Sequence, residues 1–385
     1  MSRIEEKPFG MLRKSDGQPF SEETVKNWYI ARSFVLEQLA KVEEKIAITP
    51  NSNKHLHVVV RGDHARMLAI VRQVALFAHY VNFDEENEDV TKKNRTVITI
   101  VSHDPDIREK LMAEEYLCNL PKYCAFKYND SYTLNMDSFI DIEIHVVKDY
   151  PEDSQEAALL SVCQEMVDTY WYKRQQEHFD AIDTRMAFFT DKVYHIGETI
   201  DNLPSEDIHC AKRYAMALKV FRHQKLTITP ENIFSDNDSQ AVIREKMSNI
   251  FCSDCFKSRQ RSVMAYSEEK KRNGEQVKRL DDLWEDMNNA LSRSEHARWV
   301  VEKLIMGYSP LSSQQRMRDE DLSYDAQKRT QYRKKLKRDI RQLAHIDLCS
   351  YRDLRRINPD NMKYDSFLML AIPRILERMK REGES

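Results

Sequence analysis

Between residues 56 and 147, short β-branched runs alternate with amphipathic helical segments, and few folds accommodate that order. The runs cover residues 56–60, 96–101 and 139–147, and the helical patterns between them cover 65–80 and 107–117. Short apolar runs rich in Val and Ile are typical of buried parallel strands. A strand–helix–strand–helix–strand order predicts a parallel sheet with right-handed crossovers.

Helices are expected in the sequence both before and after this sheet domain. Ser21 is a good N-cap for a helix that should run to about residue 46, and two glutamates follow it in the positive first turn. After Pro151 the β pattern stops, and we predict helices there, including a mixed segment over 179–200. The predicted fold class is α/β plus all-α. Its divisions are an N-terminal arm and helix, a sheet domain, a helical region and a C-terminal domain, at residues 1–50, 51–150, 151–285 and 286–385.

Composition narrows the possible classes of protein. The chain has 385 residues, of which 41% are hydrophobic and 32% charged, which is typical of a folded protein with two or three domains. Its formal net charge of −3 disfavours binding to nucleic acid or to an anionic membrane surface. No apolar run reaches the roughly 18 residues that span a bilayer, and the N-terminus lacks a signal-peptide pattern. Seven scattered cysteines suit a reducing compartment, so we expect a cytoplasmic protein without direct membrane insertion.

One segment of the C-terminal domain predicts a helix with two distinct faces. Over residues 292–308 the apolar side chains recur with helical spacing, at Ala297, Val300, Val301, Leu304 and Ile305. A second row places an imidazole, an indole and an ammonium on one side, at His296, Trp299 and Lys303. Gly307 then ends the helix, because glycine readily takes a positive φ.

This helix and the segment after it resemble the RyR domain, a small module repeated in ryanodine receptors and found alone in bacterial proteins. The resemblance rests on blocks in the family's order: Glu295-His296-Ala297-Arg298-Trp299, Glu302-Lys303-Leu304, Gly307-Tyr308, His345-Ile346-Asp347-Leu348, Tyr351, Leu354, Tyr364-Asp365 and Ile372-Pro373-Arg374-Ile375-Leu376. The chain has Ile346 where the family usually has Pro, and a longer link before His345. The resemblance implies a mostly helical RyR-like domain over 286–385. A faint similarity between residues 210–220 and 367–376 leaves open a degenerate first copy within 151–285.

The RyR resemblance also implies a pocket that gathers side chains from both parts of the module. Its predicted ligand-binding residues are His296, Arg298, Trp299, Lys303, Tyr308, His345, Asp347 and Tyr351. Aromatic faces stack a base, Lys and Arg neutralise phosphate, and Asp accepts hydrogen bonds from an amine or a ribose hydroxyl. The structural alternative for each residue stays open: Trp299 as a core anchor, and His345 bonded to a backbone carbonyl.

The sheet domain looks like the Rossmann-type nucleotide-binding domain of potassium-uptake regulators, the TrkA-N domain, which bacteria also join to an RyR module. Ligands of such sheets bind beyond the carboxyl ends of the strands. The cofactor-binding residues that this implies are Arg61, Gly62, Asp63, His64, Ser102 and His103. The G-x-G-x-x-G fingerprint is absent, and only seven glycines occur in the whole chain. The alternative is that Gly62 makes a turn and Asp63 caps the following helix.

Two further features allow more than one interpretation. Between Lys328 and Arg341 there are eight basic residues and one acid. This segment is a solvated helix with one docked side, a helix that faces an anion and closes over a phosphorylated ligand, or a nucleic-acid footprint, which its few aromatics disfavour. Cys252 and Cys255 have zinc-ligand spacing without a second pair, so we interpret them as unrelated thiols near a helix end.

These features predict a sensor or regulatory protein that binds a nucleotide-derived ligand, either NAD-like or a cyclic nucleotide, with no required cofactor and no metal. The resemblances suggest bacterial signalling, ion-transport regulation or antiphage defence. We also expect a homo-oligomer, and a membrane-protein or effector partner. No nucleophile elbow, P-loop, HExxH or paired-carboxylate motif occurs, so no catalytic residue is assigned. Two alternatives remain: an NAD(P)-dependent enzyme, and an interaction scaffold that binds no ligand.

Overall fold

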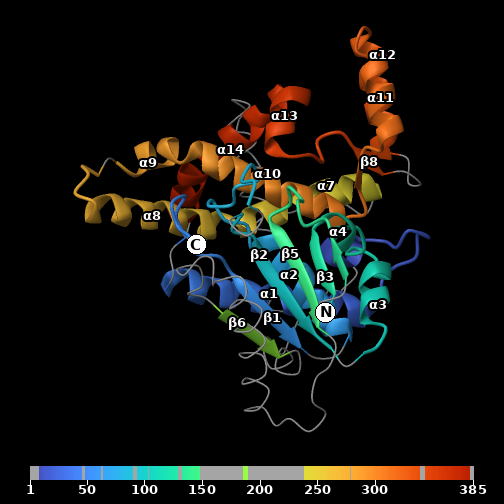
Figure 1. Ribbon diagram of the computed structural model, residues 1–385, viewed down its shortest axis with the longest axis horizontal. Coiled ribbons are helices and arrows are strands. Elements are labelled where there is room, and N and C mark those ends of the chain that lie inside the picture. The colour runs from blue at the N-terminus through green and yellow to red at the C-terminus, as the bar shows by residue number, and fades with distance from the viewer. Residues whose placement is uncertain are drawn as a thin grey trace.

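The protein is a mixed α/β structure with a mostly parallel sheet and a layer of helices above one end of it (Figure 1). The computed structural model describes residues 8–45, 48–61, 64–89, 93–102, 104–128, 132–147, 185–189, 238–277, 279–338 and 343–381.

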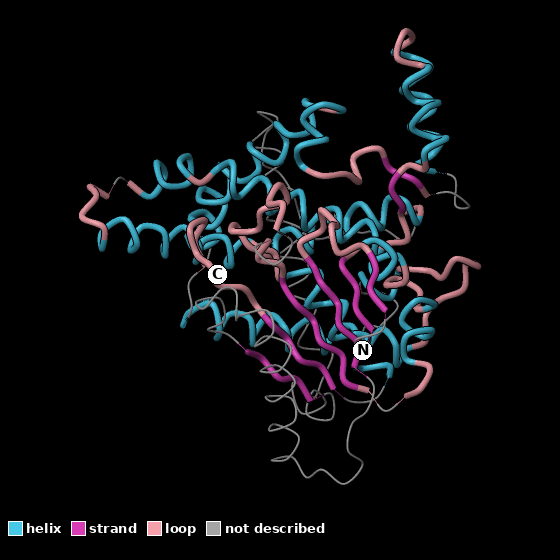
Figure 2. The backbone as a smooth tube through the Cα atoms, in the orientation of Figure 1, coloured by secondary structure: helices cyan, strands magenta, loops and turns pink. Residues whose placement is uncertain are grey.

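Among the described residues, six strands form the sheet, in the order β4-β3-β5-β2-β1-β6 (Figure 2). The strands are β1 (His57–Arg61), β2 (Thr96–Val101), β3 (Ala125–Tyr128), β4 (Tyr132–Leu134), β5 (Ile142–Val147) and β6 (Arg185–Phe189). All neighbours are parallel except β3 and β4, which pair antiparallel. In the centre, Ile98 lies in register between Val58 and Ile144, and all three side chains are fully buried. Burial on both faces explains why these strands are continuous apolar runs.

The three predicted strands correspond to β1, β2 and β5, whereas β3, β4 and β6 were not predicted. The mixed segment 179–200, predicted to be helical, contains β6, so that prediction is wrong for residues 185–189. Its sequence Arg-Met-Ala-Phe-Phe carries no period-2 alternation, and its pairing with β1 decides its conformation.

Two long helices pack against each other beside the sheet. The helix α1 (Glu22–Lys45) confirms the predicted N-terminal helix, and α2 (His64–Phe77) follows β1 directly. The side chains of α2 are buried along most of its length, including Met67, Ile70 and Val74. Three short helices complete this part: η2 (Pro8–Met11), α3 (Ile107–Ala113) and α4 (Asn119–Tyr123).

The rest of the described chain is helical. Its elements are α7 (Gln240–Asp254), α8 (Phe256–Arg272), α9 (Leu280–Asp286), α10 (Asn288–Ile305), β7 (Ser309–Pro310), α11 (Ser313–Asp321), α12 (Ala326–Arg338), β8 (Ala344–His345), α13 (Tyr351–Ile357) and α14 (Pro359–Arg381). In Figure 1, α11 and α12 stand away from the body of the protein.

The sheet part and the C-terminal helices share one hydrophobic core. Val300, Val301, Leu304 and Ile305 of α10 belong to the same buried cluster as the sheet residues, which confirms the predicted apolar face of this helix. A second cluster centres on Trp284 and joins α9 and α10 to α14. Because α10 packs on α2, a movement of α10 would change the packing of α2 against the sheet.

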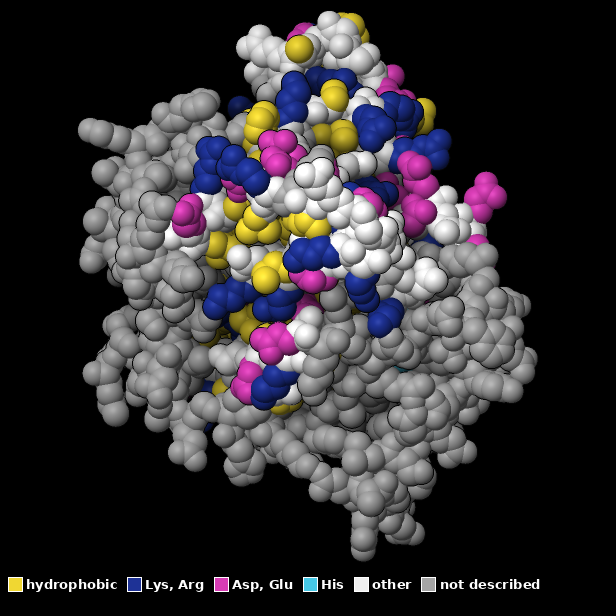
Figure 3. Space-filling model, turned by 90° about the vertical axis from the view of Figure 1, so that its left-hand side faces the viewer, with side chains coloured by type: hydrophobic (Ala, Val, Ile, Leu, Met, Phe, Trp, Pro, Cys, Tyr) yellow, Lys and Arg dark blue, Asp and Glu magenta, His cyan; other side chains and the backbone are white. Residues whose placement is uncertain are grey.

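The described helices and surface bear on possible contact with a membrane or with nucleic acid. Among the described residues, no helix combines the length and apolarity that crossing a membrane requires. Figure 3 shows Lys, Arg, Asp and Glu side chains interspersed around a group of hydrophobic side chains on one face, without a patch of a single sign.

Candidate functional site

A cavity of about 270 Å³ lies among α10, α12, β8, α13 and α14, and we call it the main cavity. Its lining residues are Glu295, His296, Arg298, Trp299, Lys337, His345, Asp347, Leu354, Asn361, Tyr364, Asp365 and Leu368. Five of these belong to the predicted ligand-binding set: His296, Arg298, Trp299, His345 and Asp347. The volume is near the lower end of the range for small-molecule sites.

The remaining predicted residues surround the same aromatic cluster. The ring centroids of Trp299 and His345 are 4.9 Å apart, and those of His296 and Tyr351 are 5.6 Å apart. The Lys303 ammonium lies 5.6 Å from the Trp299 ring centroid and 5.9 Å from that of Tyr308. The tertiary structure therefore brings together side chains from the helix and from a segment about 40 residues later, as the RyR-like pattern predicts.

A small strand pair places His345 beside the end of α10. Gly307 ends this helix with φ of 86°, and the next residues pair with β8 in parallel, with Pro310 opposite His345. The chain turn at Gly307 uses a conformation that costs other residues free energy. As a result, the ring of Tyr308 lies 6.3 Å from the His345 ring, centroid to centroid.

Hydrogen bonds assign a tautomer to each imidazole of the cavity. The Nε2 of His296 lies 2.9 Å from the carbonyl oxygen of Cys349, so this nitrogen carries the proton and donates it. The Nδ1 of His345 accepts from the backbone N–H of Asp347, so its proton is on Nε2. Burial lowers the pKa of His296, and burial with the Lys337 and Lys303 charges lowers the pKa of His345 well below its ordinary value. Both rings are neutral at pH 7.

Asp347 is held in place by two amides of the following helices. Its carboxylate oxygens accept from Nδ2 of Asn358 at 3.0 Å and from Nδ2 of Asn361 at 2.5 Å. Each carboxylate oxygen can accept more than one hydrogen bond. Asp347 therefore keeps the capacity to accept a further hydrogen bond, and its role as a ligand-binding residue stays a prediction.

Arg298 lines the main cavity, but its charge is matched inside the protein. It donates to Glu295 and to Glu302, at distances of 2.6–3.1 Å, and Arg259 also donates to Glu295. Together with Lys303 these residues form a buried ion network, a name kept below for Arg259, Glu295, Arg298, Glu302 and Lys303. We interpret Arg298 as a residue that positions α10, because an arginine with two carboxylate partners has little charge left for a phosphate.

Lys303 also takes part in this network. Its ammonium lies 2.7 Å from Oε1 of Glu302, whose side chain is 0% exposed and also accepts from Ser248. Burial opposes ionisation of Glu302, but the Lys303 and Arg298 charges outweigh it and lower its pKa. Removing Lys303 would therefore disturb folding as well as any ligand contact, and a Lys303 variant cannot separate the two roles.

Seven cavity residues were not among the predicted site residues: Glu295, Lys337, Leu354, Asn361, Tyr364, Asp365 and Leu368. The pair Tyr364-Asp365 belongs to the RyR-like blocks, so the sequence contained a signal for it. Lys337 is one of eight basic residues in one segment, and its helical position alone does not distinguish it from its neighbours.

Asp365 lies between the cavity and the buried ion network, with a side chain 19% exposed and Oδ2 at 3.9 Å from Nδ1 of His296. Burial, together with the Glu295 and Asp347 charges, raises the pKa of Asp365 well above its ordinary value, against the opposing charges of Arg298 and Arg259. The folded protein thus takes up a proton here, and the corresponding stability is lost as pH rises through the folded pKa.

The substitution Asp365→Asn is expected to gain stability relative to wild type as pH rises from 5 to 8. Asparagine resembles the protonated carboxyl group and has no proton to lose, so the variant avoids the cost of a buried charge. Free energies of unfolding in urea at the two pH values measure this difference. A difference between the two proteins that stays constant with pH would contradict the assignment.

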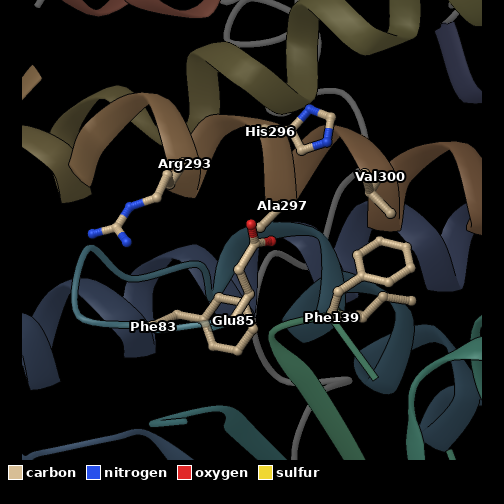
Figure 4. Close-up of a pocket in the computed structure, with 8 residues that line it drawn as sticks. Phe83, Glu85, Phe139, Arg293, His296, Ala297 and Val300 are labelled. Carbon is tan, nitrogen blue, oxygen red and sulfur yellow. The ribbon is translucent and has the colours of Figure 1, made fainter. Parts of the chain in front are cut away.

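A much smaller pocket lies on the opposite side of α10 (Figure 4). It has a volume of about 10 Å³, room for roughly one water molecule. Glu85 rises toward Ala297 there, while the His296 ring points away from it (Figure 4). The Glu85 carboxylate accepts from the backbone N–H groups of Tyr351 and Arg352, at 2.9 and 2.8 Å. The Glu85 hydrogen bonds connect the sheet part to the start of α13. The pocket itself is too small for a ligand.

The cofactor-binding edge predicted on the sheet is described only in part. Gly62, Asp63 and His103 lie outside the described residues. Arg61 ends β1 and His64 begins α2, but their side chains are likewise outside the description. Ser102 follows β2, and its hydroxyl accepts from the backbone N–H of Asp104 at 3.1 Å. The predicted Rossmann-type site remains a prediction.

The two spaced cysteines are buried in the helical core. Cys252 and Cys255 are both free thiols at the end of α7, and burial raises the pKa of each. The Cys255 thiol lies 3.9 Å from the backbone carbonyl oxygens of Leu76 and Phe77. Within the part of the chain that the structure describes, no cluster of three or more His, Cys, Asp or Glu side chains could hold a metal ion.

Comparisons with known proteins add no relative to this description. No protein-family model matches the chain, and neither the curated proteins nor the solved structures contain a match.

Proposed function

We propose that this protein is a regulatory sensor whose main cavity binds a nucleotide-derived small molecule, such as a cyclic nucleotide or a dinucleotide-like signal. The observation that carries the proposal is the convergence of Trp299, His345, Asp347 and Lys337 on one cavity of about 270 Å³. An indole face stacks a base, a carboxylate accepts from base or ribose donors, and an ammonium attracts phosphate.

The proposed output is a movement passed from the cavity to the sheet part. Three contacts support such a path. Glu85 accepts from the first N–H groups of α13, Asn119 donates to the backbone oxygen of Tyr308 at 3.0 Å, and α10 packs on α2. A ligand that favours one position of α13 and β8 would shift the position of these joints. We predict that the movement is passed on to a second copy of the chain in a homo-oligomer, or to an effector or membrane-protein partner.

The proposal is tested by the thermal stability of the full chain in the presence of candidate ligands. A ligand that binds only the folded state must raise the melting temperature. The panel contains NAD(H), NADP(H), ATP, cyclic mononucleotides and dinucleotides, and short linear oligonucleotides. An NAD(P)-dependent enzyme would consume the reduced cofactor over time, which absorbance at the nicotinamide band detects. If no compound shifts the wild-type melting temperature, the scaffold alternative is favoured.

Trp299→Leu is expected to weaken binding of the active compound roughly 10- to 100-fold, because stacking of a base on an aromatic ring contributes about 1–3 kcal/mol. Leucine keeps much of the apolar contact that Trp299 makes with the core. Titration calorimetry measures the change in affinity. The control is Tyr324→Leu, which replaces an aromatic side chain that is 80% exposed and does not line the main cavity. Equal affinities of wild type and Trp299→Leu would move the binding site elsewhere.

A further inference from the structure

The basic side chains of α12 differ in what they contact. Arg329 and Arg333 both donate to Asp319 of α11, at 2.6–2.9 Å, and hold the two helices together as a hairpin. Lys334 and Lys335 are exposed. Lys337 instead lines the main cavity. The basic residues of α12 therefore have three different roles. Two hold α11 and α12 together, others are exposed to solvent, and Lys337 lines the candidate site.

Packing at the preceding residue places Lys337 in the cavity. Leu336 is buried against Leu311, which follows β7, and against Ala344, which begins β8 and precedes His345. The hairpin is thus anchored to β8 by its apolar contact. This contact fixes the rotation of α12 about its axis, and with it the direction of Lys337, which projects about 100° further round the helix and lines the cavity.

Lys337 has no counter-ion in the described part of the protein. It forms no hydrogen bond or ion pair with any described residue, although it is partly buried. Burial lowers its pKa, with the Lys303 and Arg333 charges acting in the same direction and the Asp347 and Glu245 charges opposing them. A partly buried ammonium without a partner is costly, and an anion in the cavity would offset that cost.

We propose that Lys337 and the Nε2–H of His345 form an anion subsite in the main cavity for a single, singly charged phosphodiester group. This inference rests on the function proposed above and narrows its ligand class. The subsite lies at the wall formed by α12 and β8. The Asp347 carboxylate, held by Asn358 and Asn361, lines the same cavity, with its Oδ2 3.8 Å from Nδ1 of His345. A bound phosphodiester would link the α11–α12 hairpin to the rest of the site.

Charge balance selects the phosphodiester. Of the cavity's neighbouring cations, Arg298 and Lys303 already face Glu302, and Arg333 faces Asp319. Lys337 is therefore the lining cation without an ion-pair partner among the described residues, and the neutral His345 adds a hydrogen-bond donor without charge. The Asp347 carboxylate lines the same cavity and is held by two neutral amides, so it repels an anion of higher charge more strongly than a singly charged one. A phosphodiester carries one negative charge, a phosphomonoester carries about 1.5 to 2 at pH 7, and a triphosphate carries more. Each unmatched charge in a partly buried site weakens binding.

The test is calorimetric titration of the full chain with adenosine, 3′,5′-cyclic AMP, cyclic di-AMP and ATP, and with the corresponding guanine compounds. In wild type, the cyclic mononucleotide, with one phosphodiester charge, is expected to bind more tightly than its nucleoside, than the cyclic dinucleotide with two such charges, and than the triphosphate. Lys337→Met is expected to weaken that phosphodiester at least tenfold and to leave the nucleoside affinity unchanged, since only the phosphate contact is removed. Lys334→Met, the same change at an exposed position of α12, should alter neither affinity.

The outcomes separate this inference from the proposed function. If Lys337→Met binds the phosphodiesters as tightly as wild type, or if ATP is the tightest wild-type ligand, the anion subsite is overturned while the sensor function stands. If no compound of this panel binds wild type, the subsite is overturned, and if the wider thermal-stability panel also gives no shift, the proposed function fails with it. Urea unfolding checks the fold: loss of an unmatched ammonium should leave Lys337→Met at least as stable as wild type. Should it not fold, Lys337→Gln is used for the same comparison.

Discussion

Glu295→Gln is expected to destabilise the protein by about 3–5 kcal/mol, the usual cost of removing one partner from a buried ion pair. Glu295 accepts from Arg259 and Arg298, and the side chains of all three residues are at most 4% exposed. The buried ion network has three cations and two carboxylates, so loss of one carboxylate leaves the excess of positive charge larger. Glutamine keeps the shape of the side chain, and the free energy of unfolding in urea therefore reports mainly the charge.

A matched control distinguishes burial from charge in general. Glu37→Gln removes the carboxylate of an exposed i,i+4 pair with Lys41 on α1, where the glutamate side chain is 48% exposed. Exposed pairs contribute little, and the expected change is within about 0.5 kcal/mol. If both variants lose the same free energy, or if Glu295→Gln loses less than about 1 kcal/mol, the network does not stabilise the fold in the way described.

Acidification is expected to remove the contribution of Glu295 between about pH 4.5 and pH 2. Burial would raise the pKa of this carboxyl group, but the Arg298 and Arg259 charges outweigh burial and lower the pKa from 4.5 to about 2. A group with a lowered folded pKa contributes stability above its unfolded pKa, and that stability disappears as pH falls through the folded value. The lowering of the Glu295 pKa corresponds to about 3 kcal/mol of stability, since each pKa unit is worth about 1.4 kcal/mol.

The Glu295→Gln variant isolates this effect from other acids. Wild type and variant share every other carboxyl group, so the difference between their free energies of unfolding should be largest above pH 5 and shrink toward pH 2. Urea unfolding of both proteins at several pH values provides the curve. A difference that is independent of pH would mean that the pKa of Glu295 is the same in the folded and unfolded states, and a difference that grows as pH falls would mean that folding raises this pKa.

These two results bear on the candidate site because the network forms one side of it. Glu295 and Arg298 line the main cavity. On α10 they are the direct sequence neighbours of His296 and Trp299, respectively. Ion pairs to Arg259 of α8 hold α10 in one rotation about its axis. That rotation decides where Trp299 and His296 point, so the network stabilises the geometry that a ligand would require.

Much of the fold could be predicted because its signals are local. The β-branched runs of β1, β2 and β5, the N-cap of α1 and the apolar spacing on α10 each depend on neighbours within one or two turns of chain. The row of His296, Trp299 and Lys303 follows from the same helical period, and the structure places all three around one aromatic cluster. The association of this row with His345 came from the RyR resemblance, and the contact between the two is present.

Only the tertiary structure decided which charges face the candidate site. Arg298 and Lys303 have the residue types of phosphate ligands, yet both bind glutamates of α10 itself. Contacts from Arg259 of α8 and Ser248 of α7 to these glutamates show that tertiary packing buries the pairs. Lys337 is one basic residue among many, and the docking of Leu336 on β8 separates it from them. Likewise β6 becomes a strand by pairing with β1 across more than 100 residues of chain. Local periodicity specifies faces, whereas partners distant in the chain specify pairing and protonation, and no single-sequence pattern encodes that distance.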